Sequence, residues 1–141
     1  KIINERGCNL DKDMGPEAKL YKKVRKNIKD ISWIRIENLS SLGTPDLLGY
    51  NNSSHFFTLE LKVTKGNKVR FSPHQIAFHK THPKNTFILV EALGQRSSKL
   101  SQYFLVPGSM ITELVACGLR PEFDSCRMTL EACGLSLQNL N

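Results

Sequence analysis

The sequence has no long apolar run and no closely spaced pair of cysteines. No stretch of eighteen apolar residues occurs in the 141-residue chain, so no segment predicts a membrane-spanning helix. The intervals among Cys117, Cys126 and Cys133 match no common zinc-binding spacing. The first residues also lack the apolar segment of a secretory signal. We therefore expect no membrane contact and a cytoplasmic location, which is the host cytoplasm if a phage encodes the chain.

Acidic residues are missing from two basic stretches. The chain carries 20 Lys and Arg against 13 Asp and Glu, a net charge of +7 at pH 7. Ala18–Ile28 contains five basic residues and no acid, and Leu61–Val90 contains six basic residues, three histidines and no acid. One such stretch is typical of a solvated helix face, but two in a small chain favour a polyanionic partner such as nucleic acid.

The length and the 40% hydrophobic content predict a single domain over residues 1–141. Within it we expect an N-terminal arm at 1–14 and a C-terminal helical extension at 107–141. No segment has the composition of a linker between domains.

Apolar periodicity and turn residues predict the order of the elements. We expect helices at 16–28, 73–82, 109–117 and 125–133, and strands at 32–37, 47–50, 55–63, 86–92 and 101–106. The first three strands form an antiparallel meander in this interpretation. The strand-helix-strand connection from 55–63 to 86–92 makes these two strands parallel. The predicted fold class is therefore α/β, with a mixed central β-sheet flanked by helices.

Three polar residues on neighbouring predicted strands form a candidate catalytic site. Glu60 and Lys62 point to the same side of their strand, about 7 Å apart. Asp46 begins the preceding strand, and pairing of the two strands brings its carboxylate toward Glu60. Two converging carboxylates repel each other unless a cation neutralises them, and oxygen ligands suit Mg²⁺. Lys62 is then placed to assist a hydrolytic water, which is the chemistry of phosphodiester hydrolysis.

The motif Pro45-Asp46 followed by Glu60-Leu61-Lys62 resembles the PD-(D/E)XK signature of the restriction-endonuclease-like nuclease superfamily. The wider phrases are similar to those of VRR-Nuc nucleases and of archaeal-type and phage Holliday junction resolvases: Gly43-Thr44-Pro45-Asp46-Leu47-Leu48, Phe57-Thr58-Leu59-Glu60-Leu61-Lys62 and Ser72-Pro73-His74-Gln75. The resemblance covers about residues 15–92 and implies a restriction-endonuclease-like core. It also implies Mg²⁺ as the cofactor, with Mn²⁺ as a possible substitute.

The resemblance implies further site residues, each with a structural alternative. Glu17 matches a metal-binding glutamate of the first helix in the resolvases, but glutamate in a first helical turn is also favoured by the helix dipole. Gln75 matches a glutamine that lies near the active site of this superfamily, although Ser72 and Gln75 also form a capping box. Ser41 matches a DNA-contacting loop serine in a shifted register.

DNA contacts are predicted from charge and position. Lys65, Lys68 and Arg70 follow Lys62, where a cleaved strand would pass. The expected first helix contributes four more basic side chains: Lys19, Lys22, Lys23 and Lys26. His79, one turn after Gln75, can reach a phosphate or serve a structural role. Phosphate contacts give affinity and salt dependence without sequence selectivity.

These residues predict a Mg²⁺-dependent, structure-selective endodeoxyribonuclease. We expect Asp46, Glu60 and Glu17 to bind metal, Lys62 and Gln75 to act in catalysis, and a homodimer to cut branched DNA such as a four-way junction. One alternative is a nuclease of the same fold that processes flaps, nicks or ends in repair or phage genome processing. An alternative of another class is a non-catalytic nucleic-acid-binding module.

Overall fold

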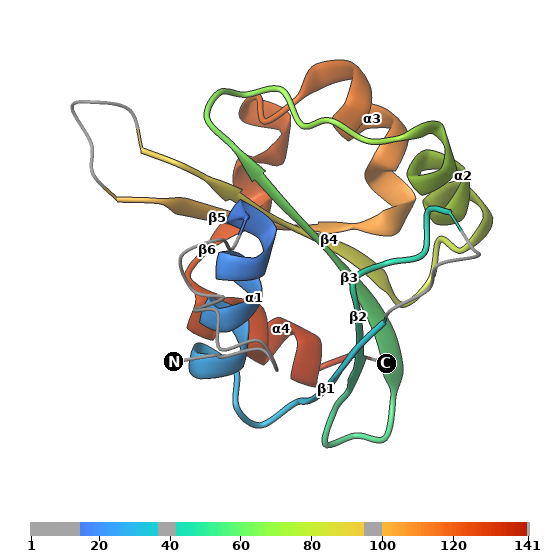
Figure 1. The fold of residues 1–141 in the computed structure, drawn as a ribbon, viewed down its shortest axis with the longest axis vertical. Coiled ribbons are helices and arrows are strands. Elements are labelled where there is room, and N and C mark those ends of the chain that lie inside the picture. The colour runs from blue at the N-terminus through green and yellow to red at the C-terminus, as the bar shows by residue number, and fades with distance from the viewer. Residues whose placement is uncertain (1–14, 37–41, 95–99, 141) are drawn as a thin grey trace, which may run out of the picture.

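A computed structural model describes residues 15–36, 42–94 and 100–140 of the chain (Figure 1). Six strands form one sheet in the order β1-β2-β3-β4-β5-β6. The strands are β1 (Ser32–Arg35), β2 (Leu47–Tyr50), β3 (Phe56–Thr64), β4 (Thr86–Ala92), β5 (Gln102–Pro107) and β6 (Arg127–Met128). The helices are α1 (Pro16–Asn27), α2 (Pro73–Thr81), α3 (Ile111–Cys117) and α4 (Leu130–Gln138), with short 3₁₀ segments η1 (Gly108–Met110) and η2 (Pro121–Cys126).

The sheet is mixed, as the sequence predicts. Strands β1, β2 and β3 form an antiparallel meander, and β3 pairs with β4 in parallel. Strand β5 is antiparallel to β4. The parallel pair β3–β4 is joined through α2, because parallel neighbours need a crossover that a tight hairpin cannot supply.

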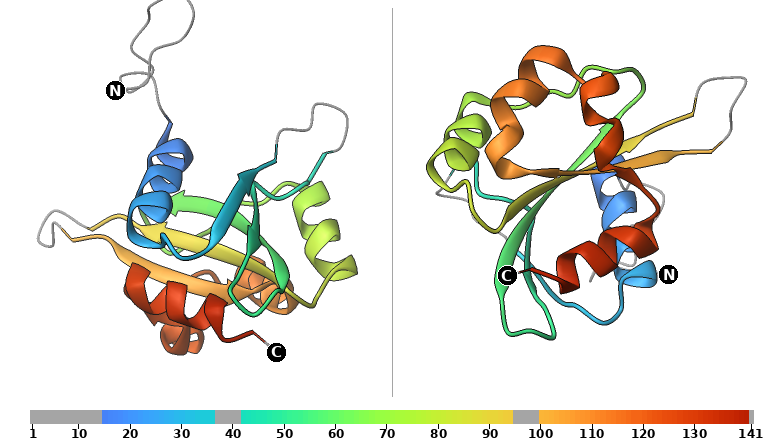
Figure 2. Two further views of the ribbon diagram at one scale, coloured as in Figure 1. Left: turned by 90° about the horizontal axis from the view of Figure 1, so that it is seen from below. Right: turned by 180° about the vertical axis from the view of Figure 1, so that it is seen from behind.

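Helices cover both faces of the sheet. On the right of Figure 2, α1 and α4 lie on one side and α2 and α3 on the other. Leu59 and Leu61 of β3 pack into the first core, which also contains residues of α1 and α4. Ile88 and Val90 of β4 pack into the second core with residues of α3 and η2. Because side chains alternate along a strand, Glu60 and Lys62 point to the α2 side.

The helix beginnings follow local sequence chemistry. Helix α1 has Pro16 in its first turn and Glu17 at its positive end, and it buries Leu20 and Val24. Helix α2 begins at a capping box in which the Ser72 hydroxyl accepts a hydrogen bond from the Gln75 amide at 3.1 Å.

The C-terminal region differs from the prediction. A helix was expected at 125–133, but η2 ends at Cys126, residues 127–128 pair with β5 as β6, and α4 begins at Leu130. The Thr129 hydroxyl caps α4 by accepting a hydrogen bond from the Ala132 amide at 3.1 Å. Residues 127–128 pair with the edge of β5, so they form β6 and are not helical. Helix α4 therefore begins after them, at the capping residue Thr129.

No helix within the described ranges is long and apolar enough to cross a membrane. Cys117, Cys126 and Cys133 are free thiols. Burial raises the pKa of the Cys133 thiol to about 12. The predicted N-terminal arm lies outside the described residues.

Candidate active site

Asp46 and Glu60 meet where β2 begins beside the middle of β3. The register pairs Leu47 with Leu59, so the two acids are the next residues opposite each other. The Asp46 backbone carbonyl accepts a hydrogen bond from Ile36 N at 2.8 Å, and its carboxylate Oδ2 accepts one from Leu61 N at 2.7 Å. The side chain of Asp46 thus takes a hydrogen bond from β3 just beyond the last β2–β3 pair. This anchoring fixes its carboxylate beside Glu60.

Glu60 is held in an environment that opposes its negative charge. Its side chain is buried, with only 3% of the residue exposed. Burial, the neighbouring Asp46 carboxylate and the more distant Glu17 together raise the pKa of Glu60 to about 9, against the favourable charge of Lys62. Its Oε2 atom is buried and has no hydrogen-bond partner among the described residues. A cation placed between the two carboxylates would remove this electrostatic penalty.

Gln75 joins Lys62 to Glu60. The amide oxygen Oε1 of Gln75 accepts a hydrogen bond from Lys62 Nζ at 2.9 Å, and its Nε2 donates one to Glu60 Oε1 at 3.1 Å. The same Oε1 accepts a hydrogen bond from the Ser72 backbone at 3.0 Å. Gln75 is therefore both the capping-box partner of Ser72 and a bridge between Lys62 and Glu60. The capping box is confirmed, and the catalytic role of Gln75 stays a prediction.

Phe71 and Gly43 complete the wall around these residues. Lys62 Nζ lies 4.8 Å from the centre of the Phe71 ring, a cation–π arrangement that keeps the ammonium at the site. Gly43 has φ of +81°, and a Cβ there would stand 2.4 Å from the His74 carbonyl oxygen. Only glycine therefore lets the loop before Asp46 pack against the first turn of α2.

A small cavity of about 30 Å³ lies between α1 and the start of β2. Its lining includes Glu17 and Asp46, together with Arg35 of β1. The space is comparable to the share of one water molecule in liquid water. Among the described residues, no three His, Cys, Asp or Glu side chains gather closely enough to hold a metal ion. The role of Glu17 as a third ligand therefore stays a prediction, whereas Asp46 and Glu60 offer the paired oxygens that Mg²⁺ prefers.

Arg35 is a basic residue of this site that the sequence analysis did not select. Its guanidinium carbon lies 5.3 Å from the centre of the Tyr21 ring, and that of Arg25 lies 5.6 Å from the same ring. The contact with Tyr21 holds Arg35 in the lining of the cavity, to which Asp46 also belongs. The predicted meander contained the signal, because strand pairing places Arg35 opposite Leu47, next to Asp46.

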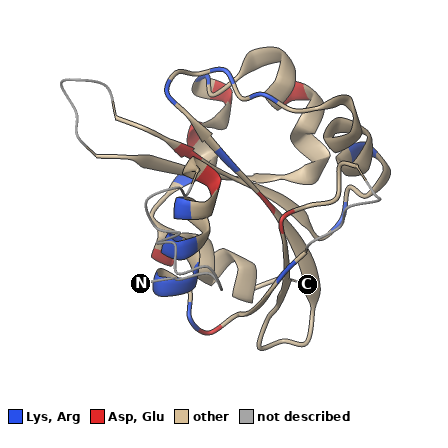
Figure 3. Cartoon of the chain, viewed as in Figure 1, with Lys and Arg blue, Asp and Glu red and all other residues tan. Residues whose placement is uncertain are grey.

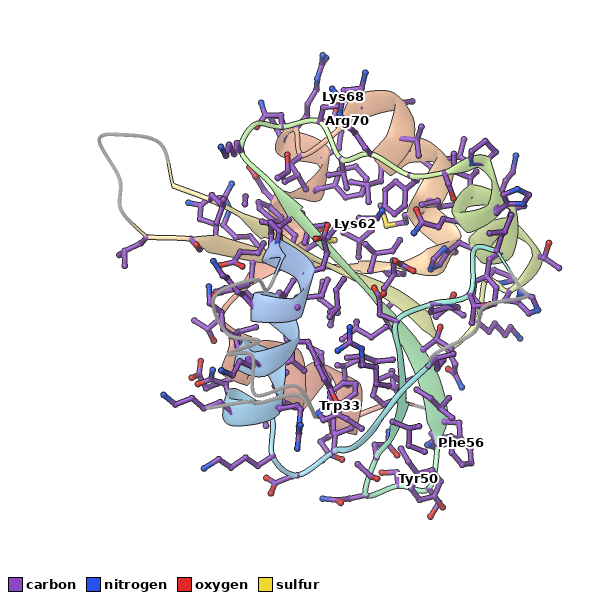
Figure 4. All side chains as sticks on the ribbon, in the orientation of Figure 1. Trp33, Tyr50, Phe56, Lys62, Lys68 and Arg70 are labelled. Atoms are coloured by element: carbon purple, nitrogen blue, oxygen red, sulfur yellow. The ribbon has the colours of Figure 1, made fainter. Side chains whose placement is uncertain are left out.

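The basic segment after β3 is firmly attached to the C-terminal region. Lys65, Lys68 and Arg70 are exposed, and Figure 4 shows Lys68 and Arg70 beyond Lys62 at the end of β3. Leu119 N donates a hydrogen bond to the Asn67 carbonyl at 2.7 Å. Thr64 Oγ1 donates to the Lys68 carbonyl at 2.8 Å, and Val69, within the same segment, is buried in the second core. These contacts hold in place the backbone that carries the three cations after the end of β3.

The basic residues of α1 fall into two groups. Lys19, Lys22 and Lys26 are exposed, and Figure 3 shows Lys and Arg gathered along α1 and along the segment after β3. Lys23 instead donates a hydrogen bond to the buried carboxylate of Glu91 on β4 at 2.5 Å. The Lys23 ammonium thus has an acidic partner within the protein, although 43% of its side chain is exposed, and its role as a DNA contact stays a prediction. Leaving that buried acid unpaired would be strongly destabilising.

His79 does not join the exposed basic surface. His79 is fully buried, and its Nδ1 lies 2.9 Å from the Gln75 carbonyl oxygen. Burial also lowers the pKa of His79, which favours the neutral ring. The predicted phosphate contact by His79 is therefore wrong, and its structural alternative holds. Ser41 lies outside the described residues.

Comparison with known proteins does not assign the chain to a family. No family model matches the sequence, and no curated protein matches it. The candidate site rests on its own geometry: two adjoining carboxylates, a lysine held beside them by an amide bridge, and exposed cations on both sides.

Proposed function

We propose that this protein is a Mg²⁺-dependent endodeoxyribonuclease of the PD-(D/E)XK superfamily, with a restriction-endonuclease-like fold. The observation that carries the proposal is the Asp46–Glu60 pair. Glu60 is buried against a second carboxylate, and its pKa is raised to about 9 in the absence of a cation. A site of this kind is costly for folding alone, and binding of a divalent cation relieves the cost.

Each residue of the site has a role in this proposal. Asp46 Oδ and Glu60 Oε2 would hold Mg²⁺, which when bound activates water and neutralises charge on the phosphate. Lys62 would stabilise the negative charge that develops on the phosphate oxygens. Gln75 positions Lys62 through a 2.9 Å hydrogen bond, which fixes the direction of an ammonium group on an otherwise flexible side chain.

The substrate proposal is branched DNA, cut by a homodimer that acts as a Holliday junction resolvase. The support is the exposed cation set on α1 and after β3, which suits phosphate binding without base selection. One such site cuts one strand, so symmetric cuts in two strands would need a second copy of the site. The alternatives are a flap, nick or end nuclease, and a non-catalytic binding module.

Mg²⁺-dependent cleavage of an end-labelled four-way junction tests the proposal, beside a flap, a nicked duplex and a linear duplex. The test variant is Asp46→Asn, which keeps an oxygen to accept the Leu61 hydrogen bond. The matched control is Asp30→Asn, the same change at an exposed residue outside the site. We expect paired symmetric cuts in the junction by the wild type and the control, and none by Asp46→Asn.

The other outcomes separate the alternatives. Cleavage of flaps or ends in place of junctions would keep the metal site and reject the resolvase assignment. Salt-sensitive DNA binding without any cleavage in Mg²⁺ or Mn²⁺ would reject the nuclease in favour of the binding module. Equal activity of Asp46→Asn and the wild type would reject the site itself.

A further inference from the structure

The face of β1, β2 and β3 that carries Asp46 and Glu60 continues into an exposed apolar surface. In the strand register, Ile34 lies opposite Leu48, and Leu48 lies opposite Thr58. The next row in the same direction contains Tyr50 opposite Phe56. We call Ile34, Leu48, Tyr50 and Phe56 the open sheet face. Their strand neighbours Trp33, Leu47 and Phe57 pack into the first core on the opposite side.

The open sheet face is exposed to solvent although its side chains are apolar or aromatic. Ile34 is 54% exposed, Phe56 is 56% exposed and Tyr50 is 37% exposed. The rings of Tyr50 and Phe56 lie side by side with centroids 4.5 Å apart. Figure 4 shows them together where β3 begins, whereas Lys68 and Arg70 lie beyond its other end. Several exposed apolar side chains gathered on one sheet face favour a binding surface.

The patch is close to the candidate catalytic carboxylates. Side chains on one face of a strand repeat every two residues, which spans about 7 Å. The row of Ile34 and Leu48 is therefore about 7 Å from the row of Asp46 and Glu60, and the row of Tyr50 and Phe56 is about 13 Å from it. A DNA strand that reaches the carboxylates along this face passes over the two rings within a few nucleotides.

Cations border the open sheet face on the side of α2. The amide of Thr58 on β3 donates a hydrogen bond to the Asn85 carbonyl at 3.0 Å, which holds the connection between α2 and β4 beside the patch. Lys80 and Lys84, at the end of α2 and within this connection, are exposed. Aromatic rings next to lysines are the combination that binds unpaired nucleotides, because bases stack on the rings and phosphates meet the cations.

A second copy of the chain is a weaker candidate for this surface. A partner protein seated on Ile34 and Leu48 would stand about 7 Å from Asp46 and Glu60. It would obstruct the approach of DNA to these carboxylates from that direction. An unpaired strand is thin enough to cover the patch and to enter the site at the same time.

We propose that the open sheet face binds unpaired bases of the DNA substrate next to the cut, by stacking on Tyr50 and Phe56. The inference rests on the proposed nuclease function and deepens it, because it gives the substrate class. The protein selects DNA in which bases are unstacked within a few nucleotides of the cleaved bond. Continuous duplex offers no free base to these rings and gains nothing from them.

The test compares the affinity of the metal-free protein for a labelled single-stranded oligonucleotide and for a duplex of equal length, by fluorescence anisotropy in EDTA. The double variant Tyr50→Ala/Phe56→Ala removes both rings, and Tyr50→Phe/Phe56→Tyr keeps them. The matched apolar control is Leu135→Ala, at a residue of α4 that is 66% exposed and lies outside the patch.

We expect the alanine double variant to lose at least about 30-fold in affinity for the single strand, since each stacked base contributes about fivefold or more. Its duplex affinity should change less than about twofold, and the ring-keeping variant and Leu135→Ala should bind like the wild type. Equal losses for both DNA forms, or none, would overturn the inference. So would sedimentation showing a dimer that the alanine double variant converts to a monomer.

The binding assay and the cleavage assay fail independently. Selective loss of single-strand binding supports the open sheet face even if the wild type cuts no DNA, which would reject only the nuclease. Cleavage with no preference for unpaired bases would leave the nuclease in place and reject the open sheet face as its selector.

Discussion

Replacing Glu60 by Gln tests the electrostatic argument directly, because it removes the buried charge and keeps the size of the side chain. The folded protein raises the pKa of Glu60 from the ordinary value of 4.5 to about 9. Between these values the folded chain keeps a proton that the unfolded chain has lost. The free energy of unfolding therefore falls as the pH rises through this window, and it levels off only above the folded pKa.

The size of the effect follows from the width of the window. Each pH unit between the two pKa values changes the free energy of unfolding by about 1.4 kcal/mol. The pH of 7.5 lies about three units above the unfolded pKa. At this pH, Glu60 has lowered the free energy of unfolding by about 4 kcal/mol relative to its value in acidic solution. The amide introduced by Glu60→Gln does not titrate, so this variant should be more stable than the wild type at pH 7.5 and nearly equal to it near pH 4.5.

Urea unfolding in EDTA at several pH values between 4.5 and 8.5 measures this difference. Subtracting the variant from the wild type isolates Glu60 together with its interaction with Asp46, because the remaining titrating groups are shared. Added Mg²⁺ should stabilise the wild type, by about 2.7 kcal/mol at a hundred times its dissociation constant, and should leave Glu60→Gln nearly unchanged. Parallel pH profiles for the two proteins, or a variant less stable than the wild type at pH 8, would refute the reasoning.

Three further substitutions have definite expected outcomes. Lys62→Ala should lower kcat for cleavage by about 100-fold or more while DNA affinity stays within a few fold, as gel-based turnover and anisotropy assays would show. Gln75→Ala should lower both kcat and the free energy of unfolding, the latter by about 1 kcal/mol through the lost capping box; an unchanged kcat in single-turnover assays would contradict the bridge to Lys62. At Gly118, φ is +66° and a Cβ would stand 2.5 Å from the Asn67 carbonyl oxygen, so Gly118→Ala should displace the basic segment after β3. This variant should therefore weaken DNA binding and flatten its salt dependence. Gly66→Ala is the matched control in a salt titration, since nothing lies within 4 Å of a Cβ at this position. Equal effects of Gly118→Ala and Gly66→Ala would show that attachment of the basic segment to the C-terminal region does not matter for DNA binding.

Most of the sheet, and the contact between Asp46 and Glu60, could be predicted from the sequence. Strand β4 and the meander were predicted because continuous apolar runs and turn residues are local signals. The meeting of Asp46 and Glu60 followed from the same pairing. The two functions of Gln75 could be named but not combined, because the capping box is local and the contact with Glu60 depends on how α2 sits on the sheet.

The features that the sequence analysis missed involve contacts between residues far apart in the chain. Lys23 has the sequence context of a solvated lysine, and its partner Glu91 lies 68 residues away. His79 is buried by η1, where a Cβ on Gly108 would stand 3.0 Å from its ring. Residues 127–128 form β6 only because β5 offers them an edge. No local pattern contains these long-range partners.

The double role of Gln75 links the opening of a helix end to the chemistry of the site. Helix ends fray far more readily than helix centres. If the first turn of α2 opens, the Ser72 and Gln75 hydrogen bonds break together, and Lys62 and Glu60 lose their common partner at the same moment. Under the proposed nuclease function, the fraction of molecules with a closed first turn would set the fraction that is competent for hydrolysis. Amide hydrogen exchange at Gln75 would then report on that fraction.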